Sequence, residues 1–266
     1  MYKEFYALKE NPFNVTSDPA FFFSSKRHGE AFSHLIYGIK QRKGIIVITG
    51  EIGTGKTTLC RTLLNHLDNT TKTALILNPD FSDLQLLQLI TKDFGIVVKT
   101  QNKITLINGL NEFLLRETSQ GHNVALIVDE AQNLKERQLE QIRLLSNLET
   151  EIEKILQIII VGQPELNEKL KLTSLRQLNQ RIAVRYHILP LEKSELSNYI
   201  VHRLKIAGAV DKLHFTKEAI QEIYLYSGGT PRLVNIICDR ALLAGFVQGT
   251  FTIDYHVVKK CIEEVR

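Results

Sequence analysis

The chain has 266 residues, of which 44% are hydrophobic, 23% are charged and none is tryptophan. This is the composition of an ordinary globular protein, and it excludes a collagen, a low-complexity tract and a disordered acidic tail. The formal net charge of +4 (33 basic minus 29 acidic residues) makes the chain mildly basic. Such a charge is compatible with nucleic acid or anionic lipid as a partner, but it does not point to either.

The sequence predicts neither a membrane span nor a secretory leader. No apolar run approaches the roughly 18 residues that are needed to cross a bilayer. The first six residues lack the basic-then-apolar layout of a signal peptide. The three cysteines, Cys60, Cys238 and Cys261, lie far apart, which favours buried thiols in a reducing cytoplasm over a disulfide framework. We therefore expect a cytoplasmic protein.

Five short runs rich in β-branched residues alternate with helical patterns in the first 190 residues. Most of them are nearly continuous in apolar residues, as expected of parallel strands covered on both faces. The runs are Ile45–Thr49, Thr73–Leu77, Val124–Val128, Ile155–Val161 and Tyr186–Leu189. Between them, apolar residues at helical spacing predict helices within residues 59–67, 107–114 and 139–145. This alternation predicts an α/β fold with a doubly wound, five-stranded parallel sheet.

From residue 191 onward the pattern is entirely helical. The predicted helices cover residues 194–207, 216–227, 231–247 and 255 to the terminus. Their boundaries are marked by residues with strong capping preferences. These are Thr216, Gly228-Gly229, Thr230-Pro231 and Asp254. We therefore predict two domains: an α/β domain over residues 1–190, which includes an N-terminal segment 1–44, and a helical lid domain over residues 191–266.

A phosphate-binding loop follows the first predicted strand. Residues 50–57 match the pattern G-x-x-x-x-G-K-[ST] at every fixed position, between a strand and a helix that begins near Lys56. The glycines let backbone N–H groups turn toward phosphate oxygens, and the helix N-terminus adds its positive end. Lys56 is expected to reach the β- and γ-phosphates of ATP, and Thr57 to bind Mg²⁺. The nucleotide-binding residues predicted here are Gly50, Glu51, Ile52, Gly53, Thr54, Gly55, Lys56, Thr57 and Thr58.

An acidic pair, Asp129-Glu130, ends the third predicted strand. In sheets of this kind such a pair lies beside the phosphate loop. Asp129 is expected to hold Mg²⁺ through water, and Glu130 to orient and polarise the attacking water, which favours a hydrolase over a kinase. The alternative for Asp129 is a helix N-cap.

Three further polar positions are candidates for sensing or stabilising the γ-phosphate. Gln163 follows the fourth strand, where a turn residue before Pro164 is the alternative. Arg181, and after it Arg185, is expected to face a neighbouring subunit and to stabilise transition-state charge in trans; a solvated salt-bridging face is the alternative. Arg232 opens a lid helix, where a cation opposes the helix dipole unless an anion such as phosphate lies nearby. Its alternative is a surface arginine that pairs with Asp239 or another carboxylate.

Together these motifs resemble an AAA+ ATPase, and most closely the general secretion pathway protein A (ExeA-like) family. The matching stretches span nearly the whole chain. They are residues 5–8, 11–13, 18–19, 22, 28–31, 35–39, 49–58, 129–132, 144–149, 162–166, 178–182 and 229–232.

This resemblance implies a role in assembling envelope machinery, such as a secretion pore or a pilus system. Long members of the family add a transmembrane helix and a periplasmic peptidoglycan-binding part. This sequence has neither, so a short member and an excised cytoplasmic domain both stay open. The implied location is the cytoplasm, including the inner face of the inner membrane. The resemblance also implies an adenine pocket that uses residues 27–30 and the aromatics near Phe13 and Phe22, with core packing of residues 21–23 as the alternative.

The preferred function is an ATP-binding and ATP-hydrolysing motor or switch. It would self-associate in a ring or another ATP-dependent oligomer and act on an envelope partner. An ATP-gated DNA-binding regulator, similar to transposition ATPases, is the second hypothesis. The dispersed positive charge and the lack of a winged helix after the lid argue against it. The third is a scaffold that hydrolyses ATP slowly and signals by occupancy.

Overall fold

The computed structural model describes residues 1–77, 79, 81–149 and 153–265. Internal contacts divide the chain into two compact units. Unit 1 comprises Met1–His28, Gly53–Thr58 and Leu189–Arg266, and unit 2 comprises Gly29–Ile52 and Leu59–Ile188. The sequence predicts one domain over residues 1–190 and another over residues 191–266. The two units are divided differently, since unit 1 also contains two segments from the first 58 residues, and the predicted domain boundary stays a prediction.

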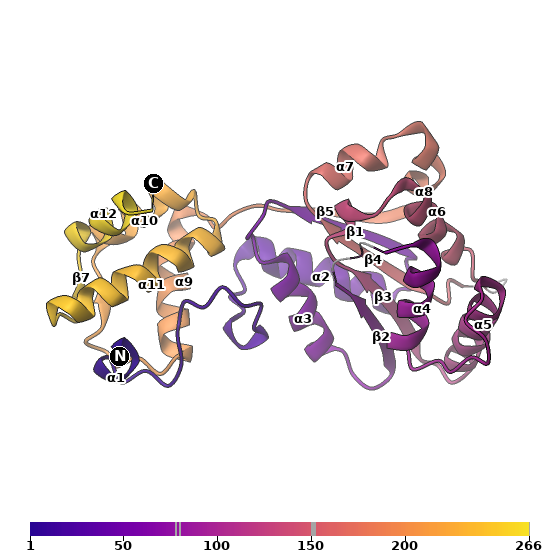
Figure 1. Cartoon of the computed structure of the whole chain (residues 1–266), viewed down its shortest axis with the longest axis horizontal. Coiled ribbons are helices and arrows are strands. Elements are labelled where there is room, and N and C mark those ends of the chain that lie inside the picture. Colours follow the sequence, from indigo (N-terminus) through magenta and orange to yellow (C-terminus); the bar gives the residue numbers. More distant parts are fainter. Residues whose placement is uncertain (78, 80, 150–152, 266) are drawn as a thin grey trace. The chain divides into compact units, whose positions relative to one another are not determined.

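Unit 2 contains a five-stranded sheet with the strand order β2-β3-β4-β1-β5 (Figure 1). Every pairing in it is parallel. The strands are β1 (Ile45–Gly50), β2 (Thr71–Ile76), β3 (Asn123–Val128), β4 (Gln157–Gly162) and β5 (Ile182–Ile188). β1 and β4 are buried at every residue, as parallel strands covered on both faces should be. The predicted α/β fold is confirmed.

The edge strand β5 begins four residues earlier than the sequence predicts. Half-buried Ile182 and Val184 alternate in it with exposed Ala183 and Arg185. An edge strand with one solvated face alternates in polarity. The prediction required a continuous apolar run, and it therefore found only the end of this strand.

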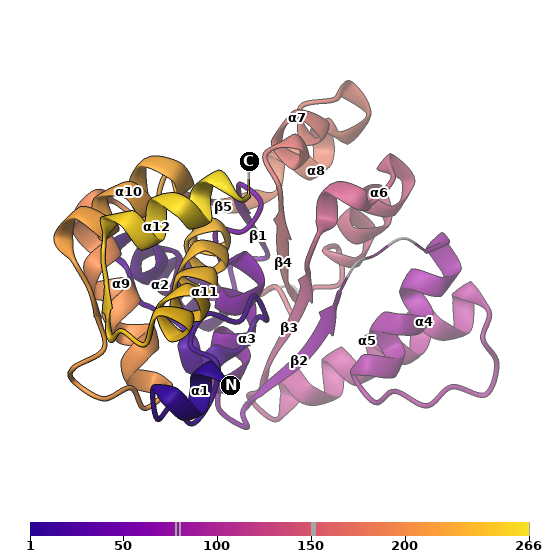
Figure 2. The same cartoon turned by 60° about the vertical axis from the view of Figure 1, so that its left-hand side comes forward.

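Helices pack against the sheet of unit 2, and α4 and α5 lie beside β2 and β3 (Figure 2). The helices are α2 (Lys26–Lys40), α3 (Lys56–His66), α4 (Asp83–Asp93), α5 (Lys103–Ser119), α6 (Glu136–Leu145), α7 (Glu165–Leu170) and α8 (Arg176–Gln180). Helix α4 was not predicted, although Ser82 and Gln85 form a capping box at its start. Short 3₁₀ turns are η1 (Pro19–Phe21), η2 (Ala131–Asn133) and η3 (Thr173–Leu175).

Unit 1 is mainly helical. Its elements are α1 (Tyr2–Phe5), α9 (Lys193–Ile206), β6 (His214–Phe215), α10 (Lys217–Ser227), α11 (Pro231–Gln248), β7 (Thr252–Ile253) and α12 (Tyr255–Glu263), drawn in orange to yellow from α9 onward (Figure 1). Two predicted caps make their side-chain bonds: Thr216 accepts from the Ala219 N–H, and Asp254 accepts from the Val257 N–H. Thr230 stands at the N-cap of α11, as predicted, but its side chain makes no capping hydrogen bond. The prediction that residues 191–266 are entirely helical was wrong, because β6 and β7 pair in parallel. Each of these strands has two residues, which are too few to show the alternation of apolar and polar residues that marks a strand in a sequence.

The N-terminal segment belongs to unit 1. The Tyr6 hydroxyl lies 3.1 Å from the Leu242 carbonyl oxygen and 3.0 Å from that of Thr250. The buried guanidinium of Arg203 donates to the carbonyl oxygens of Pro12 and Asn14. These bonds bring the first 14 residues into the same core as α9 and α11.

Two of the compositional predictions concern the cysteines and membrane spans. Cys60, Cys238 and Cys261 are all buried, as predicted, and none of them is in a disulfide. Burial in an apolar core raises the pKa of the Cys238 thiol. Within the described residues no helix has the length and apolar character that crossing a membrane requires.

Candidate functional site

The phosphate loop has the backbone geometry that its glycines predict. Gly53 and Gly55 have φ angles of +80° and +93°, which lie in the left-handed region that glycine adopts at little cost. Lys56 is 5% exposed, and Thr54 is fully buried. The loop follows β1 and runs into α3, so the strand–loop–helix context of the motif is present.

Arg232 lies against this loop within unit 1. Its backbone N–H donates to the Gly53 carbonyl oxygen at 3.2 Å. A Cβ atom added at Gly53 would come within 2.5 Å of the Arg232 Cβ atom, so the contact requires glycine. Asp239, one of the carboxylates considered as a partner, instead accepts a hydrogen bond from the Tyr2 hydroxyl. The exposed guanidinium of Arg232 makes no hydrogen bond or ion pair with the residues that the structure describes.

His28 connects the segment ahead of the loop to the loop itself. Its Nε2 atom lies 2.8 Å from the Thr54 carbonyl oxygen, and its Nδ1 atom lies 2.7 Å from Ser25 Oγ. A carbonyl oxygen can only accept, so Nε2 carries the proton and Nδ1 accepts from the serine hydroxyl. Burial lowers the pKa of His28, and the bond to Thr54 and the charge of Glu195 oppose this shift. The imidazole is therefore held neutral against the loop.

We expect His28 to make the folded state sensitive to acid. The unfolded chain takes up a proton on His28 near pH 6.5, whereas the folded chain does so only at lower pH. The stability from neutral His28 is thus fully present above about pH 6.5 and is lost as pH falls toward the lowered pKa. In urea unfolding from about pH 7 to about pH 5, His28→Gln should lose less stability than wild type.

His202 provides the matched control for this measurement. Burial also lowers the pKa of His202, so wild type and His28→Gln share its contribution to acid sensitivity. A His202→Gln chain should therefore still lose the stability that depends on neutral His28 when the pH falls. Identical pH slopes for wild type and His28→Gln would contradict the assignment.

The aromatic residues expected in an adenine pocket separate into two groups. The Phe13 ring is 2% exposed and packs edge-on against Phe215, so it belongs to the core of unit 1. Phe21 is buried as well, and the Arg203 guanidinium lies over its ring. The half-buried Phe22 ring packs edge-on against His28 at a centroid distance of 5.9 Å. Of the expected aromatics, Phe22 is therefore the one beside the loop-contacting histidine.

The acidic pair lies at the carboxyl end of β3. Asp129 is 1% exposed, and its carboxylate accepts from the Glu130 N–H at 2.9 Å. Glu130 has a left-handed backbone with φ of 52°, which is unusual for a residue with a side chain and is typical of functional turns. The residue at the N-cap of η2 is Glu130 rather than Asp129, so the predicted alternative of an N-cap at Asp129 does not match this turn.

Two amide side chains surround the Glu130 carboxylate. The amide nitrogen of Gln132 donates to Glu130 Oε2 at 2.5 Å, and that of Gln163 donates to the same oxygen at 3.3 Å. The structure thus brings together Glu130 and Gln163, which the sequence predicted at the ends of two separate strands. Sequence reasoning missed Gln132. The signal that could have found it is the stretch Asp129-Glu130-Ala131-Gln132, in which Gln132 follows the acidic pair and belongs to the family resemblance.

The two arginines proposed to act in trans lie away from the carboxyl edge of the sheet. Arg181 immediately precedes β5, whose first residue, Ile182, pairs with Ile45 at the start of β1. Arg181 is exposed, and its guanidinium lies 3.5 Å from Ser146 Oγ. Arg185 lies in the middle of β5, and its guanidinium donates to the side chain of Asn179. Because β1 rises about 3.3 Å per residue, Arg181 lies roughly 20 Å along the strands from the edge where the phosphate loop begins.

Comparison with known proteins gives two matches to the sequence. A family model described as an AAA domain matches residues 39–170. Over its whole length the chain is 43% identical to general secretion pathway protein A of Aeromonas hydrophila. The chain carries an AAA domain. It spans 48% of the length of that relative, and the predicted resemblance to general secretion pathway protein A is confirmed.

Solved structures confirm the AAA+ fold. Cdc6p from Pyrobaculum aerophilum has a TM-score of 0.70 at 18% identity. The match covers 92% of this chain and 70% of the Cdc6p chain. ORC2 from Aeropyrum pernix, in its complexes with ADPNP and ADP, has a TM-score of 0.68 at 17% identity, with coverages of 92% and 71%. The RuvB Holliday junction branch migration motor of Thermotoga maritima has a TM-score of 0.59 at 17% identity, with coverages of 91% and 70%. At these identities the likeness shows the fold alone.

The predicted metal-binding residues carry donor groups of the right chemistry. Thr57 in unit 1 has a hydroxyl oxygen and Asp129 in unit 2 has a carboxylate oxygen, and both are hard donors of the kind that Mg²⁺ prefers. Mg²⁺ commonly keeps several waters and takes its remaining ligands from substrate phosphates. Gly53 and Gly55 place no Cβ atoms beside the loop backbone. The atoms that come close to these positions belong to the side chains of Arg232, near Gly53, and His28, near Gly55.

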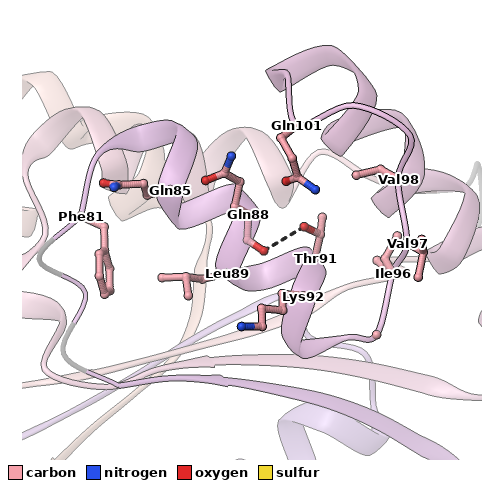
Figure 3. A pocket seen from close by; sticks show the side chains of 11 residues that line it. Phe81, Gln85, Gln88, Leu89, Thr91, Lys92, Ile96, Val97, Val98 and Gln101 are labelled. Carbon is pink, nitrogen blue, oxygen red and sulfur yellow. Dashed lines mark hydrogen bonds between the residues drawn. The ribbon is translucent and has the colours of Figure 1, made fainter.

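A separate cavity of about 690 Å³ lies in unit 2 of this AAA+ protein (Figure 3). It is lined by Phe81 ahead of α4, by α4 itself and by the segment that leads from α4 toward α5, with Leu89 and Val98 among its other apolar side chains. Neither the phosphate loop nor the acidic pair contributes to it. Lys92 is the charged residue in its lining, so the cavity has none of the carboxylates that hydrolysis requires.

Proposed function

We propose that this AAA+ protein binds ATP with Mg²⁺ and hydrolyses it to ADP and phosphate. The observation that carries the proposal is the Glu130 carboxylate, which two amides hold by one oxygen at the carboxyl end of β3. A carboxylate held in this way is a suitable general base for a water molecule. Residues of the phosphate loop, with the residue types of a nucleotide cradle, begin at the carboxyl end of β1 in the same sheet.

Each predicted site residue has a proposed role in this reaction. The loop residues 50–58 would bind the phosphates, with Lys56 on the β- and γ-phosphates. Thr57 and Asp129 would supply oxygens to Mg²⁺, which neutralises developing charge on the phosphates when bound. Gln163 would contact the γ-phosphate, and Arg232 would sense it. The N–H of Arg232 already bonds Gly53 of the loop, and this supports a lid role for residues 191–266.

We further propose that the protein works as an oligomeric motor or switch in the assembly of a bacterial secretion or pilus system. This rests on the 43% identity to a relative whose name is general secretion pathway protein A. Self-association would let Arg181 of one subunit complete the site of its neighbour. The site of action would be the cytoplasmic face of the inner membrane, with an envelope assembly protein as the partner.

The test is the rate of ATP hydrolysis per chain, measured against protein concentration with and without duplex DNA. A rate per chain that rises with concentration is expected, because the active site would be shared between subunits. Lys56→Ala should give the background rate, since the ammonium group that holds the phosphates is missing. A constant rate per chain would contradict the shared site. Strong stimulation by DNA would instead favour an ATP-gated DNA-binding regulator.

A further inference from the structure

The side chain of Gln132 bridges the ends of two neighbouring strands beside the acidic pair. Its amide nitrogen donates to Glu130 Oε2 at 2.5 Å, and its amide oxygen accepts from the Gln163 N–H at 3.0 Å. An ionised carboxylate can only accept and a backbone N–H can only donate. The orientation of the Gln132 amide is therefore fixed by its two partners.

The backbone that carries Gln132 is also held firmly. The Lys169 ammonium group donates to the carbonyl oxygen of Gln132 at 2.6 Å and to that of Leu134 at 2.7 Å. On the other side, a Cβ atom added at Gly162 would lie 2.9 Å from the Gln132 amide oxygen. The turn η2 and the end of β4 thus leave the Gln132 side chain little room to move.

This arrangement treats the two oxygens of Glu130 differently. Oε2 accepts from Gln132 and, at a longer distance, from Gln163. Oε1 accepts no hydrogen bond from any residue that the structure describes. One oxygen is therefore anchored, and the other remains available to accept the proton of a water molecule.

We propose that Gln132 is a positioning residue for ATP hydrolysis. It holds Glu130 by Oε2, so that Oε1 faces the attacking water, and it ties this orientation to Gln163, which directly follows the neighbouring strand β4. Gln132 itself touches neither water nor phosphate in this role. The inference rests on the proposed hydrolysis, and it adds a residue whose loss should slow the chemical step without weakening nucleotide binding.

The test compares Gln132→Leu with Gln141→Leu in the full chain. Gln132→Leu removes both amide bonds but keeps a side chain of similar size, so kcat should fall about 10²-fold, as expected for a misplaced catalytic group. KM and the dissociation constant for ATP should stay at the wild-type values. Gln141 is 5% exposed on α6, and its amide has no hydrogen-bond partner among the described residues. Gln141→Leu, the same substitution at a buried glutamine, should keep wild-type kcat.

A double variant separates positioning from a merely structural role. If Gln132 acts only through Glu130, Gln132→Leu combined with Glu130→Gln should turn over no more slowly than Glu130→Gln alone. A further loss in the double variant, or a wild-type kcat in Gln132→Leu, would overturn the inference while leaving the proposed function intact. Absence of hydrolysis by wild-type protein would overturn both.

Discussion

Replacing Glu130 by glutamine is expected to lower turnover by about 10²-fold or more while ATP stays bound. The glutamine oxygen can still accept the hydrogen bonds that Gln132 and Gln163 donate to Glu130 Oε2. The other oxygen becomes an amide nitrogen, which cannot accept a proton from water. The substitution therefore removes the base and changes little else. Single-turnover hydrolysis of labelled ATP, with binding measured separately, checks both parts of the expectation.

Lys56→Ala is the control that separates chemistry from binding. It should lose binding and hydrolysis together, whereas Glu130→Gln should lose hydrolysis alone. Equal turnover by Glu130→Gln and wild type would instead support the hypothesis of a scaffold that signals by nucleotide occupancy.

Replacing Arg181 by alanine is expected to lower turnover per chain about 10³-fold, if its guanidinium stabilises transition-state charge on a neighbouring subunit. Arg181 is exposed, and it precedes β5 at the amino edge of the sheet, away from the edge where the phosphate loop of its own chain begins. Its charge also lowers the pKa of Lys154, after the larger effect of burial. Two neighbouring cations repel each other, and an anion contributed by a neighbouring subunit would relieve that repulsion.

Mixing variants tests whether Arg181 acts in trans. Arg181→Ala chains keep Glu130, and Glu130→Gln chains keep Arg181, so an equimolar mixture should form some complete sites and recover turnover. Arg176 is an exposed arginine in the same segment, and Arg176→Ala should keep wild-type turnover. No recovery in the mixture would count against the role in trans. A loss in Arg185→Ala without one in Arg181→Ala would assign the role to Arg185.

The sheet could be predicted from sequence because its central strands leave a simple pattern. β1 and β4 are buried on both faces, so Ile45–Ile48 and Ile158–Val161 are uninterrupted apolar runs. The helix boundaries of unit 1 were equally visible, because the caps at Thr216 and Asp254 depend on single residues and their nearest neighbours. Local rules were sufficient in both cases.

The parts that could not be predicted depend on contacts between distant segments. The bond between His28 and Thr54 joins residues 26 positions apart. The bond between Gln163 and Glu130 joins residues 33 positions apart, and it forms because β3 and β4 are neighbours in the sheet. Gln132 has no periodic or capping signature, since its importance comes from its two partners. The predicted edge strand was too short for a different reason. The solvated face of β5 interrupts the apolar run on which the prediction relied.

The most direct test of the account is calorimetric titration of well-folded protein with ATP in the presence of Mg²⁺, using the Glu130→Gln chain so that hydrolysis does not contribute heat. The account predicts uptake of one nucleotide per chain, with the binding heat lost when Lys56→Ala is added to the same chain. Protein that is folded by circular dichroism and takes up no adenine nucleotide would contradict it.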